Sequence, residues 1–591
     1  RVIEFTEEAA DEIGYDVTYG DSVTGDRPLV VRDDDGRVRI FPAAELFERA
    51  EVNDDIVITS DGGPVGSATL GKERASLPGW EALSLADDGT AEWQPIEEVV
   101  RHESDGEVVN LQHTFGESTT TQDHSYVVEE GDEYVERPPE AVTDPLRIPD
   151  VPSVDTVDTV DVYEVLGGDT REYVDGRAVG KEHGYGKTER VHTDGEYVWF
   201  GHPRHGESDS TVKVQREIDL TEPEGRSLVR LLAAYITEGS ASTEETTDSR
   251  FGASIAESRR EWLEGIESDY ERLFENVDVS VIASDTSDER TVGDETQSGQ
   301  SESTYDDETT TLQMMNELSA VFFREFAGQT SRGKRIPSFV YHLEDELQQL
   351  FVETLLGGDG SREFPRYTDE YAQEHFDFET TSRELAAGLS ILLTQRGRKH
   401  SLKYRSEKDR YTVRTCGHYR SGRDPVLEER DHDGYVYDLS VAENENFVDA
   451  VGGIVLHNTD SVMLSLSDVE TENTDVPDPV REAHPEMSES ELTTLTAAIE
   501  TSEKIESHIN DRYDEFAREE LDADEHRFQI EFEKLYRRFF QAGKKKRYAG
   551  HIVWKEGKHV DDIDITGFEY TRSDIAPITK RVQKRVIEMI V

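Results

Sequence analysis

Sulfur and long apolar runs are nearly missing from this chain. Its 591 residues include one cysteine, Cys416, so no disulfide can form within the chain. This scarcity is typical of a reducing compartment. No run of about 18 apolar residues occurs, which excludes an apolar helix that spans a membrane. We therefore expect a cytoplasmic protein without a membrane partner.

Positive charge is also scarce. The chain has 63 Lys and Arg residues against 130 Asp and Glu residues, a formal net charge of −67. Such acidity can indicate disorder or an acidic tail, but here it is spread over segments that keep apolar periodicity. An acidic surface solvated by strong brine fits this pattern better. At roughly 150 residues per domain, the length predicts three or four domains.

Two short segments far apart in the chain have the pattern of one β-hairpin. The first is "YDVTYGD", which ends at Asp21, and the second is "TDSVMLSL", which begins at Thr459. Joined directly they give "YGDTDS", with Asp21 and Asp460 two positions apart. Carboxylates held on a stiff hairpin can bind the divalent metals that nucleotidyl transfer requires. Residues 22–458 therefore have the character of an insertion.

The joined string resembles motif C of the family B DNA polymerases. "QAGKKKRYAGHIVW", residues 541–554, resembles the segment with which that family grips DNA, and it holds the densest basic cluster of the chain. The resemblance implies Mg²⁺ as cofactor, bound by Asp460 and Asp21, and primer–template DNA and deoxynucleoside triphosphates as partners. It implies these DNA-binding residues: Lys544, Lys545, Lys546, Arg547 and Tyr548. Because the family's other motifs are missing, we expect a fragment that needs the remainder of the polymerase chain.

The two ends of the insertion resemble those of an intein, a segment that excises itself from its host protein. Ser22 stands first, Asn458 last, and Thr459 follows. The resemblance implies that Ser22 Oγ attacks the carbonyl of Asp21 and that Thr459 Oγ takes over the acyl group. Asn458 then cyclises through its side-chain amide and releases the insertion. No cofactor takes part.

Four further residues match intein positions that assist these steps. "TTTQDHSYVV" supplies a Thr-x-x-His arrangement, Thr121 and His124, and "GYVYDLSV" supplies Asp438. The resemblance assigns the first pair to the Asp21–Ser22 bond, Asp438 to transesterification, and His457 to the cyclisation of its neighbour. A lone histidine in a β-rich segment is more often structural, but the joint order of these residues favours splicing. Arg27 stands where many relatives have Thr.

Two segments within the insertion resemble the paired LAGLIDADG helices of homing endonucleases. They are "SLVRLLAAYITEGSAS", residues 227–242, and "ELQQLFVETLLGGDGS", residues 346–361. Each contains an acidic residue before glycine, Glu238 and Asp359. The resemblance implies that both carboxylates are catalytic and bind Mg²⁺ at adjoining helix ends, with a double-stranded DNA homing site as partner. The alternative is two ordinary amphipathic helices with C-cap glycines.

These segments together predict a multidomain protein of a salt-loving archaeon. Its parts are an all-β Hint-type splicing domain, an α+β LAGLIDADG endonuclease domain and a split α+β fragment of a polymerase palm and thumb. Within the last part, Ser488 and Glu491 form a capping-box pattern that predicts a helix start. The predicted boundaries are 1–21 (palm), 22–150 (splicing domain), 151–215 (linker or DNA-recognition region), 216–424 (endonuclease), 425–458 (splicing domain) and 459–591 (palm and start of thumb).

Two other functions stay open at this stage. One is a hedgehog-like autoprocessing protein, which has the same β-rich fold but only cleaves; the pair of Asn458 with Thr459 argues against it. The other is a non-catalytic, acidic DNA-associated protein, which would leave the "YGD" and "TDS" strings as coincidence.

The charge excess makes a prediction about salt. Repulsion between exposed carboxylates reaches ~10 Å at 0.1 M salt and about 3 Å at 1 M, so folding, and with it splicing, should strengthen as salt is added. We expect the yield of spliced product to rise steeply toward molar salt. Equal yield in dilute buffer would contradict this reading of the acidity.

Overall fold

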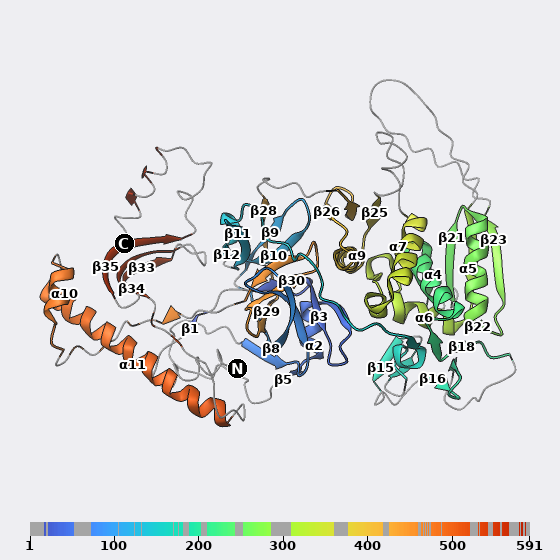
Figure 1. Ribbon diagram of the computed structural model, residues 1–591, viewed down its shortest axis with the longest axis horizontal. Coiled ribbons are helices and arrows are strands. Elements are labelled where there is room, and N and C mark those ends of the chain that lie inside the picture. The colour runs from blue at the N-terminus through green and yellow to red at the C-terminus, as the bar shows by residue number, and fades with distance from the viewer. Residues whose placement is uncertain are drawn as a thin grey trace, which may run out of the picture.

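The computed structural model describes most of the chain between Ser22 and Thr566 (Figure 1). The described residues are 17–18, 22–52, 72–104, 106–122, 124–131, 133–168, 171–174, 177–180, 188–201, 210–242, 252–284, 309–359, 376–417, 425–458, 463–464, 466, 469, 471, 474–485, 487–519, 530, 532, 534–541, 548–555, 558–566, 578, 581–582 and 585–586. Among their helices, none has the length and apolar character that crossing a membrane requires.

Strands from both ends of the insertion build one antiparallel sheet. In order along it lie β12 (Glu133–Arg137), β11 (Tyr126–Glu130), β31 (Ile454–His457), β30 (Asn446–Asp449), β3 (Pro28–Arg32), β7 (Glu81–Leu85), β8 (Ala91–Glu103), β29 (Tyr435–Val441), β2 (Val23–Thr24), β10 (Glu117–Thr121), β9 (Glu107–Gln112) and β28 (Val426–Asp431). Off this path lie β4 (Val38–Pro42), β5 (Glu51–Val52) and β6 (Lys72–Ser76), and α2 (Ala43–Arg49) follows β4. Late strands, β29 to β31 near the end of the insertion, lie between early strands, β2 to β12 near its start. Neither end of the insertion can therefore complete this sheet alone.

A buried ion pair joins the early and late strands. The Arg27 guanidinium, fully buried, donates from Nε to Asp449 Oδ2 at 2.7 Å and from Nη2 to Asp449 Oδ1 at 3.0 Å. Ser118 Oγ donates to Asp449 Oδ2 at 2.7 Å, and the Val451 amide donates to Oδ1 at 2.9 Å. The residue that departs from the usual intein sequence thus holds a structural position in the middle of the sheet.

The inserted helical region contains twice a helix, a strand, a second helix and two further strands, in that order, and the first copy adds β20 (Gly239–Ser242) and α6 (Glu317–Ala327). The first copy is α4 (Pro223–Glu238), β20, β21 (Gly252–Glu257), α5 (Arg260–Leu273), β23 (Val279–Ser284), β24 (Thr309–Met314) and α6. The second is α7 (Asp345–Asp359), β25 (Asp377–Thr380), α9 (Arg383–Gln395), β26 (His400–Arg405) and β27 (Arg410–Thr415). The sheet orders β21-β24-β23 and β25-β27-β26 correspond strand for strand. The helical region is therefore built from two related units.

Local sequence explains where the helices of the two copies begin and end. Helix α4 has Pro223 in its first turn and ends before Gly239, and its buried face includes Leu228, Leu232 and Tyr235. Helix α9 begins after Ser382, whose Oγ accepts from the Leu385 amide at 3.1 Å. The sequence patterns read as paired amphipathic helices therefore do form helices, and α4 lies beside α7 (Figure 1).

A smaller sheet precedes the first copy, where the sequence alone gave no secondary structure. It contains β15 (Arg177–Gly180), β14 (Arg171–Val174), β16 (Thr188–Thr193), β17 (Tyr197–Gly201), β18 (Lys213–Gln215) and β22 (Phe274–Glu275), in that order. A two-stranded sheet joins β13 (Thr159–Asp161) to β19 (Glu217–Asp219) around the short helix α3 (Val162–Val165). Because β18 pairs with β22, this sheet extends across the predicted boundary at residue 215.

The sheet built by both ends of the insertion, called the splicing sheet after the function predicted for it, packs against the second copy. Arg147 of the former donates to the His400 carbonyl at 3.1 Å and to Thr394 Oγ1 at 2.9 Å. Buried Val30 and Val38 belong to the same apolar core as Leu389 of α9. The two parts therefore share a core, and a destabilising change in one can weaken the other.

The C-terminal segment lies on the other side of the splicing sheet from the helical region (Figure 1). It contains α10 (Asp478–Ala483), the long α11 (Glu489–Glu519) and a sheet of β33 (Lys534–Gln541), β34 (Tyr548–Lys555) and β35 (Lys558–Thr566). The predicted capping box is confirmed, because the Ser488 amide donates to Glu491 Oε2 at 2.8 Å and the Glu491 amide to Ser488 Oγ at 3.3 Å. Leu492 and Leu495 pack with Val553 and Trp554 beneath the helix.

The buried ion pair generates a stability prediction. Asp449→Ala removes the carboxylate that accepts two hydrogen bonds from the buried Arg27 guanidinium and leaves, among the described residues, only Glu117, 3.6 Å from Arg27 Nη1, as its ion-pair partner. This should lower the free energy of unfolding by about 3–5 kcal/mol. The double variant Arg27→Met with Asp449→Leu removes both charges and should recover most of that loss. Denaturant unfolding at high salt measures both. A double variant as unstable as the single one would contradict this role of the pair.

Candidate functional site

The sheet register brings both ends of the insertion to one short connection. Val23 pairs with Thr120, so Ser22 lies opposite Thr121 when the ladder is extended by one residue. Tyr126 pairs with Leu456, and two further steps place His124 opposite Asn458. The predicted Thr-x-x-His segment is therefore the connection between β10 and β11 against which both ends are held.

Backbone and side-chain contacts fix the first end at Thr121. The Thr121 amide donates to the Ser22 carbonyl at 2.8 Å, and the Ser22 amide donates to Thr121 Oγ1 at 3.1 Å. Ser22 is 1% exposed. Its amide nitrogen belongs to the bond that the intein resemblance expects to break, so Thr121 contacts the reacting bond directly. Asp21, on the other side of that bond, lies outside the described residues.

The sequence analysis missed a histidine beside Ser22. His102 Nε2 lies 3.1 Å from Ser22 Oγ, and His102 Nδ1 lies 3.0 Å from the Glu103 carbonyl. The ring is 7% exposed. No motif in the linear sequence marks His102, because its position depends on β8, β29 and β2 being neighbours in the sheet.

His124 is fully buried at the start of β11. Its ring lies edge-on to Tyr126 at 6.0 Å and to Phe447 at 6.1 Å between centroids, and its amide donates to the Thr121 carbonyl at 3.3 Å. Aromatic surroundings on two sides hold the ring orientation. The predicted histidine therefore lies on the connection against which both ends are held, and it is shielded from water.

The second end is held by the turn after β29. The Asn458 amide donates to the Glu445 carbonyl at 2.9 Å. With its side-chain amide oriented to satisfy both groups, Asn458 donates to the Glu445 carbonyl at 2.7 Å and accepts from the Val441 amide at 3.0 Å. A β-bulge between Ser440 and Val441 interrupts the ladder to β8 at this point, and bulges redirect backbone groups in this way.

His457 contacts the carbonyl that Asn458 would attack. Its Nδ1 lies 2.5 Å from the Asn458 carbonyl oxygen, and its Nε2 lies 3.3 Å from Glu136 Oε1. A carbonyl only accepts, so Nδ1 carries the hydrogen and polarises that carbonyl. The His457 amide donates to the Ser125 carbonyl at 2.9 Å, which ties this end to the same connection as Ser22.

Asp438 lies on β29 next to the first end. Val23 pairs with Tyr437, so one further step places Asp438 opposite Ser22. Its side chain is half-buried, and its Oδ1 accepts from the Leu439 amide at 2.9 Å. Thr459, its expected reaction partner, lies outside the described residues.

In the helical region, α4 and α7 meet at small residues near their C-terminal ends. A Cβ added to Gly358 would lie 2.2 Å from Thr237 Oγ1 and 3.4 Å from Glu238 Cγ. Only glycine allows this approach, which brings Glu238 beside the residue that precedes Asp359. The Asp359 side chain lies outside the described residues, and the Glu238 carboxylate is an oxygen donor of the kind that Mg²⁺ binds. Within the described chain, no group of three or more His, Cys, Asp or Glu residues forms a metal site.

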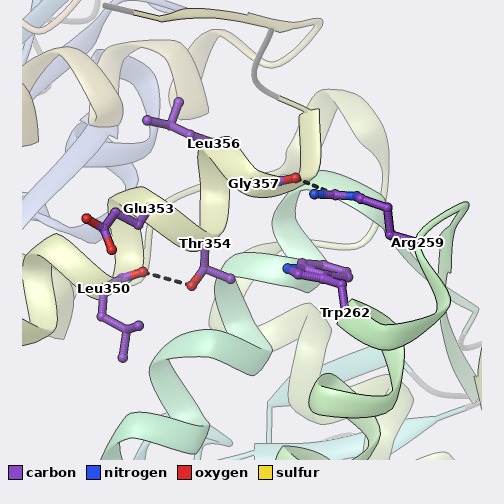
Figure 2. A pocket seen from close by; sticks show the side chains of 7 residues that line it. All are labelled: Arg259, Trp262, Leu350, Glu353, Thr354, Leu356 and Gly357. Carbon is purple, nitrogen blue, oxygen red and sulfur yellow. Dashed lines mark hydrogen bonds between the residues drawn. The ribbon is translucent and has the colours of Figure 1, made fainter. Parts of the chain in front are cut away.

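Basic groups stabilise the same helix ends. Arg259 donates to the Gly357 carbonyl and to Glu257, and it lies at the cleft between α5 and α7 above Trp262 (Figure 2). The Glu257 carboxylate chiefly, and Glu238 in smaller part, raise the pKa of Arg259. Lys334 Nζ donates to the Tyr235 carbonyl at 2.7 Å, and burial lowers the pKa of Lys334 to about 6. Both contacts hold the helix turns on which the acidic residues stand.

The two sheets of the helical region differ in charge. The exposed basic residues on β26 and β27 are Lys403, Arg405, Arg410 and Arg414. Arg410 pairs with Glu379, and Arg414 pairs with Asp377. The strands β20, β21, β23 and β24 carry Ser, Thr and Gln and contain no Lys or Arg. Two unlike faces therefore correspond to the two copies.

Most predicted polymerase site residues cannot be placed. Asp21 and Asp460 lie outside the described residues, as do Lys544, Lys545, Lys546 and Arg547, and for Tyr548 only the backbone at the start of β34 is described. The strands on either side are described: β1 (Val17–Thr18) pairs antiparallel with β32 (Met463–Leu464). In the joined chain the turn between Thr18 and Met463 would be centred on Thr459, as a hairpin requires.

Comparisons with known proteins find relatives among DNA polymerases. Residues 487–591 match the model of DNA polymerase family B. A DNA polymerase of Pyrococcus horikoshii is 30% identical over 25% of this chain and 11% of its own length. One of Thermococcus hydrothermalis is 21% identical over 99% of this chain and 30% of its own length. The chain therefore spans less than a third of either relative.

Solved structures are similar to parts of this chain, and their TM-scores over the whole chain are low. A transcription factor IIB Mvu mini-intein has a TM-score of 0.16 and 18% identity, over 20% of this chain and 65% of its own. The endonuclease I-DmoI in complex with DNA and Mn has a TM-score of 0.21 and 11% identity, over 33% of this chain and 90% of its own. Residues 487–591 are thus similar to the DNA polymerase family B model, and the chain has inteins and a homing endonuclease among its structural neighbours.

Proposed function

We propose that residues 22–458 excise themselves from a family B DNA polymerase and join Asp21 to Thr459. One observation carries the proposal: both ends of the insertion are held on residues 121–125, Ser22 through Thr121 and His457 through Ser125. Proximity of this kind turns reactions between distant residues into local ones. Ser22 and Asn458 are both buried, so water competes poorly for the acyl intermediates.

The first half of the reaction uses the contacts around Ser22. Its Oγ forms a bond to the Asp21 carbonyl carbon, the bond from that carbon to Ser22 N breaks, and the amine takes up a proton. Thr121 Oγ1, which receives the Ser22 N–H, orients the breaking bond. Thr459 Oγ then bonds to the ester carbonyl carbon, and the bond from that carbon to Ser22 Oγ breaks, so that Ser22 regains its hydroxyl proton. Asp438, which lies opposite Ser22 when the ladder is extended by one residue, is the carboxylate available to accept the proton of Thr459 Oγ and pass it on.

The second half uses the contacts around Asn458. Its side-chain nitrogen attacks its own backbone carbonyl carbon, the bond from that carbon to Thr459 N breaks, and a proton passes from the side-chain amide to the Thr459 amine. That amine then attacks the Asp21 acyl carbon and displaces Thr459 Oγ, which leaves an amide bond between Asp21 and Thr459. Developing charge on the Asn458 carbonyl oxygen is stabilised by His457 Nδ1–H. The Val441 amide and Glu445 carbonyl hold the side chain in one orientation. This backbone cradle for Asn458 favours full splicing over hedgehog-like cleavage, in which such a residue has no task.

Single variants should separate the two halves. Ser22→Ala removes the first nucleophile, so cleavage at Asp21 should stop while slow cleavage after Asn458 continues. Asn458→Ala should do the reverse and leave the ester between Asp21 and Ser22 open to hydroxylamine. Electrophoresis of the fragments in molar salt distinguishes these outcomes. Release of both flanks by Asn458→Ala at the parental rate would contradict the assigned roles.

We also propose that the two copies in the insertion form a DNA endonuclease. Glu238 and Asp359 would hold Mg²⁺ at the adjoining ends of α4 and α7, and the ion would polarise a scissile phosphate. The fit of Gly358 against Thr237 and Glu238 supports this assignment. The basic face of β26 and β27 would bind DNA phosphates, and the Ser- and Thr-rich face of the first copy would contact the duplex through neutral hydrogen bonds.

This proposal predicts separable activities. Glu238→Ala should lower cleavage of double-stranded target DNA at least about 100-fold, because charge stabilisation at the phosphate is lost. Splicing should continue, since Glu238 lies outside the shared core. Glu346→Ala, at the exposed N-terminal turn of α7, is the matched control and should keep both activities. Loss of splicing by folded Glu238→Ala protein would contradict the division into two modules.

The flanking segments are proposed to form the Mg²⁺-dependent catalytic hairpin of the polymerase only after excision. Misplacing reacting groups by about 1 Å can cost roughly 100-fold in rate, and the precursor separates Asp21 from Asp460 by a whole domain. With the upstream polymerase region restored, the splice-blocked variant Ser22→Ala with Asn458→Ala should not extend a primer. The spliced enzyme should extend it, and Asp460→Ala should abolish that extension. Robust extension by the blocked precursor would overturn this proposal.

A further inference from the structure

His102 is a buried histidine in contact with the first nucleophile, and neither the intein resemblance nor the mechanism above uses it. It belongs to β8, which at this position pairs with β6 on one side and β29 on the other. His102 and Thr24 both lie opposite Val436, one on each side of β29. The three residues form a row on one face, and Ser22, two residues before Thr24, points to the same face. The sheet itself therefore aims the ring at Ser22.

The hydrogen bonds of the ring fix its tautomer. The Glu103 carbonyl oxygen can only accept, so His102 Nδ1, 3.0 Å away, carries the hydrogen. In the neutral ring Nε2 then has a lone pair, and at 3.1 Å it accepts the hydrogen of Ser22 Oγ. A general base is oriented in this way when one ring nitrogen donates to a carbonyl and the other accepts the hydrogen of the nucleophile's hydroxyl.

We infer that His102 is the general base that activates Ser22 in the first step of splicing; this inference rests on the splicing function proposed above. As Oγ bonds to the Asp21 carbonyl carbon, its proton passes to His102 Nε2. The carbon–nitrogen bond to Ser22 then breaks, and the imidazolium returns one proton to the Ser22 amine. Atoms and charge balance without any co-reactant, and the ring is neutral again at the end of the step.

A serine nucleophile has particular need of such a base. A hydroxyl is almost entirely protonated at neutral pH, whereas a thiol with a pKa near 8.5 is partly ionised without help. Among the hydrogen bonds described for this part of the chain, the one from Ser22 Oγ to a histidine ring goes to His102 Nε2, at 3.1 Å. His124, by contrast, follows Thr121 in the chain, and Thr121 contacts the amide side of the breaking bond.

The test compares His102→Gln in two nucleophile backgrounds, both carrying Asn458→Ala so that the first step is isolated. Gln keeps a hydrogen-bonding group but cannot take the proton. With Ser22 in place, the rate of hydroxylamine-sensitive ester formation should fall about 10²–10⁴-fold. With Ser22→Cys, the same change should cost less than about tenfold, since the thiol needs less activation.

Other outcomes separate this inference from the function on which it rests. Equal losses in the serine and cysteine backgrounds would assign His102 a merely structural role and overturn the inference. A parental rate in His102→Gln with serine would overturn it as well, while leaving splicing intact. No trappable ester in the parent protein would overturn the splicing function and the inference together. Cleavage after Asn458, measured in His102→Gln with the native Asn458, should proceed at the slow rate expected of Ser22→Ala, and this rate reports that the fold is intact.

Discussion

Interleaved antiparallel pairing is the constraint on which the rest of the molecule depends. Strands β29, β30 and β31 follow the helical region in the chain, yet they pair with β2, β3, β8 and β11 near its start. Since side chains alternate with a period of two, a slip of one residue would turn Ser22, His102 and Asp438 to the opposite face. The register therefore determines which side chains meet at the reacting bonds. The long helical region between β28 and the early strands is accommodated because the chain leaves this sheet and returns to the same sheet.

The buried Arg27–Asp449 pair reinforces this register. Its two hydrogen bonds, with those from Ser118 and Val451, satisfy a buried carboxylate that joins early and late strands. An ion pair of this kind adds little net stability but strongly disfavours arrangements that leave either charge unpaired. The same sheet shares an apolar core with α9. Excision and DNA cleavage would thus be chemically separate but mechanically coupled through packing.

The sequence alone could predict those parts that local pattern encodes. The helix pair, the capping box at Ser488 and the segment containing Thr121 and His124 all have a short-range signal, and the structure contains a helix, a cap or a sheet connection at each. His102 has none, because its neighbour is 80 residues away and their meeting depends on strand order. The sheet of β14 to β18 was missed for a similar reason: its strands are short, most of them are polar, and β22, the partner of β18, lies beyond α5.

Peptide sequencing of the product by mass spectrometry, after incubation in molar salt, tests the central claim most directly. If both ends of residues 22–458 react on the connection at Thr121 to Ser125, digestion should yield a peptide that reads Tyr-Gly-Asp-Thr-Asp-Ser across the new bond from Asp21 to Thr459. Separate peptides that end at Asp21 and begin at Thr459, with no joined form, would mean cleavage without ligation. Persistence of the intact 591-residue chain would contradict the account altogether.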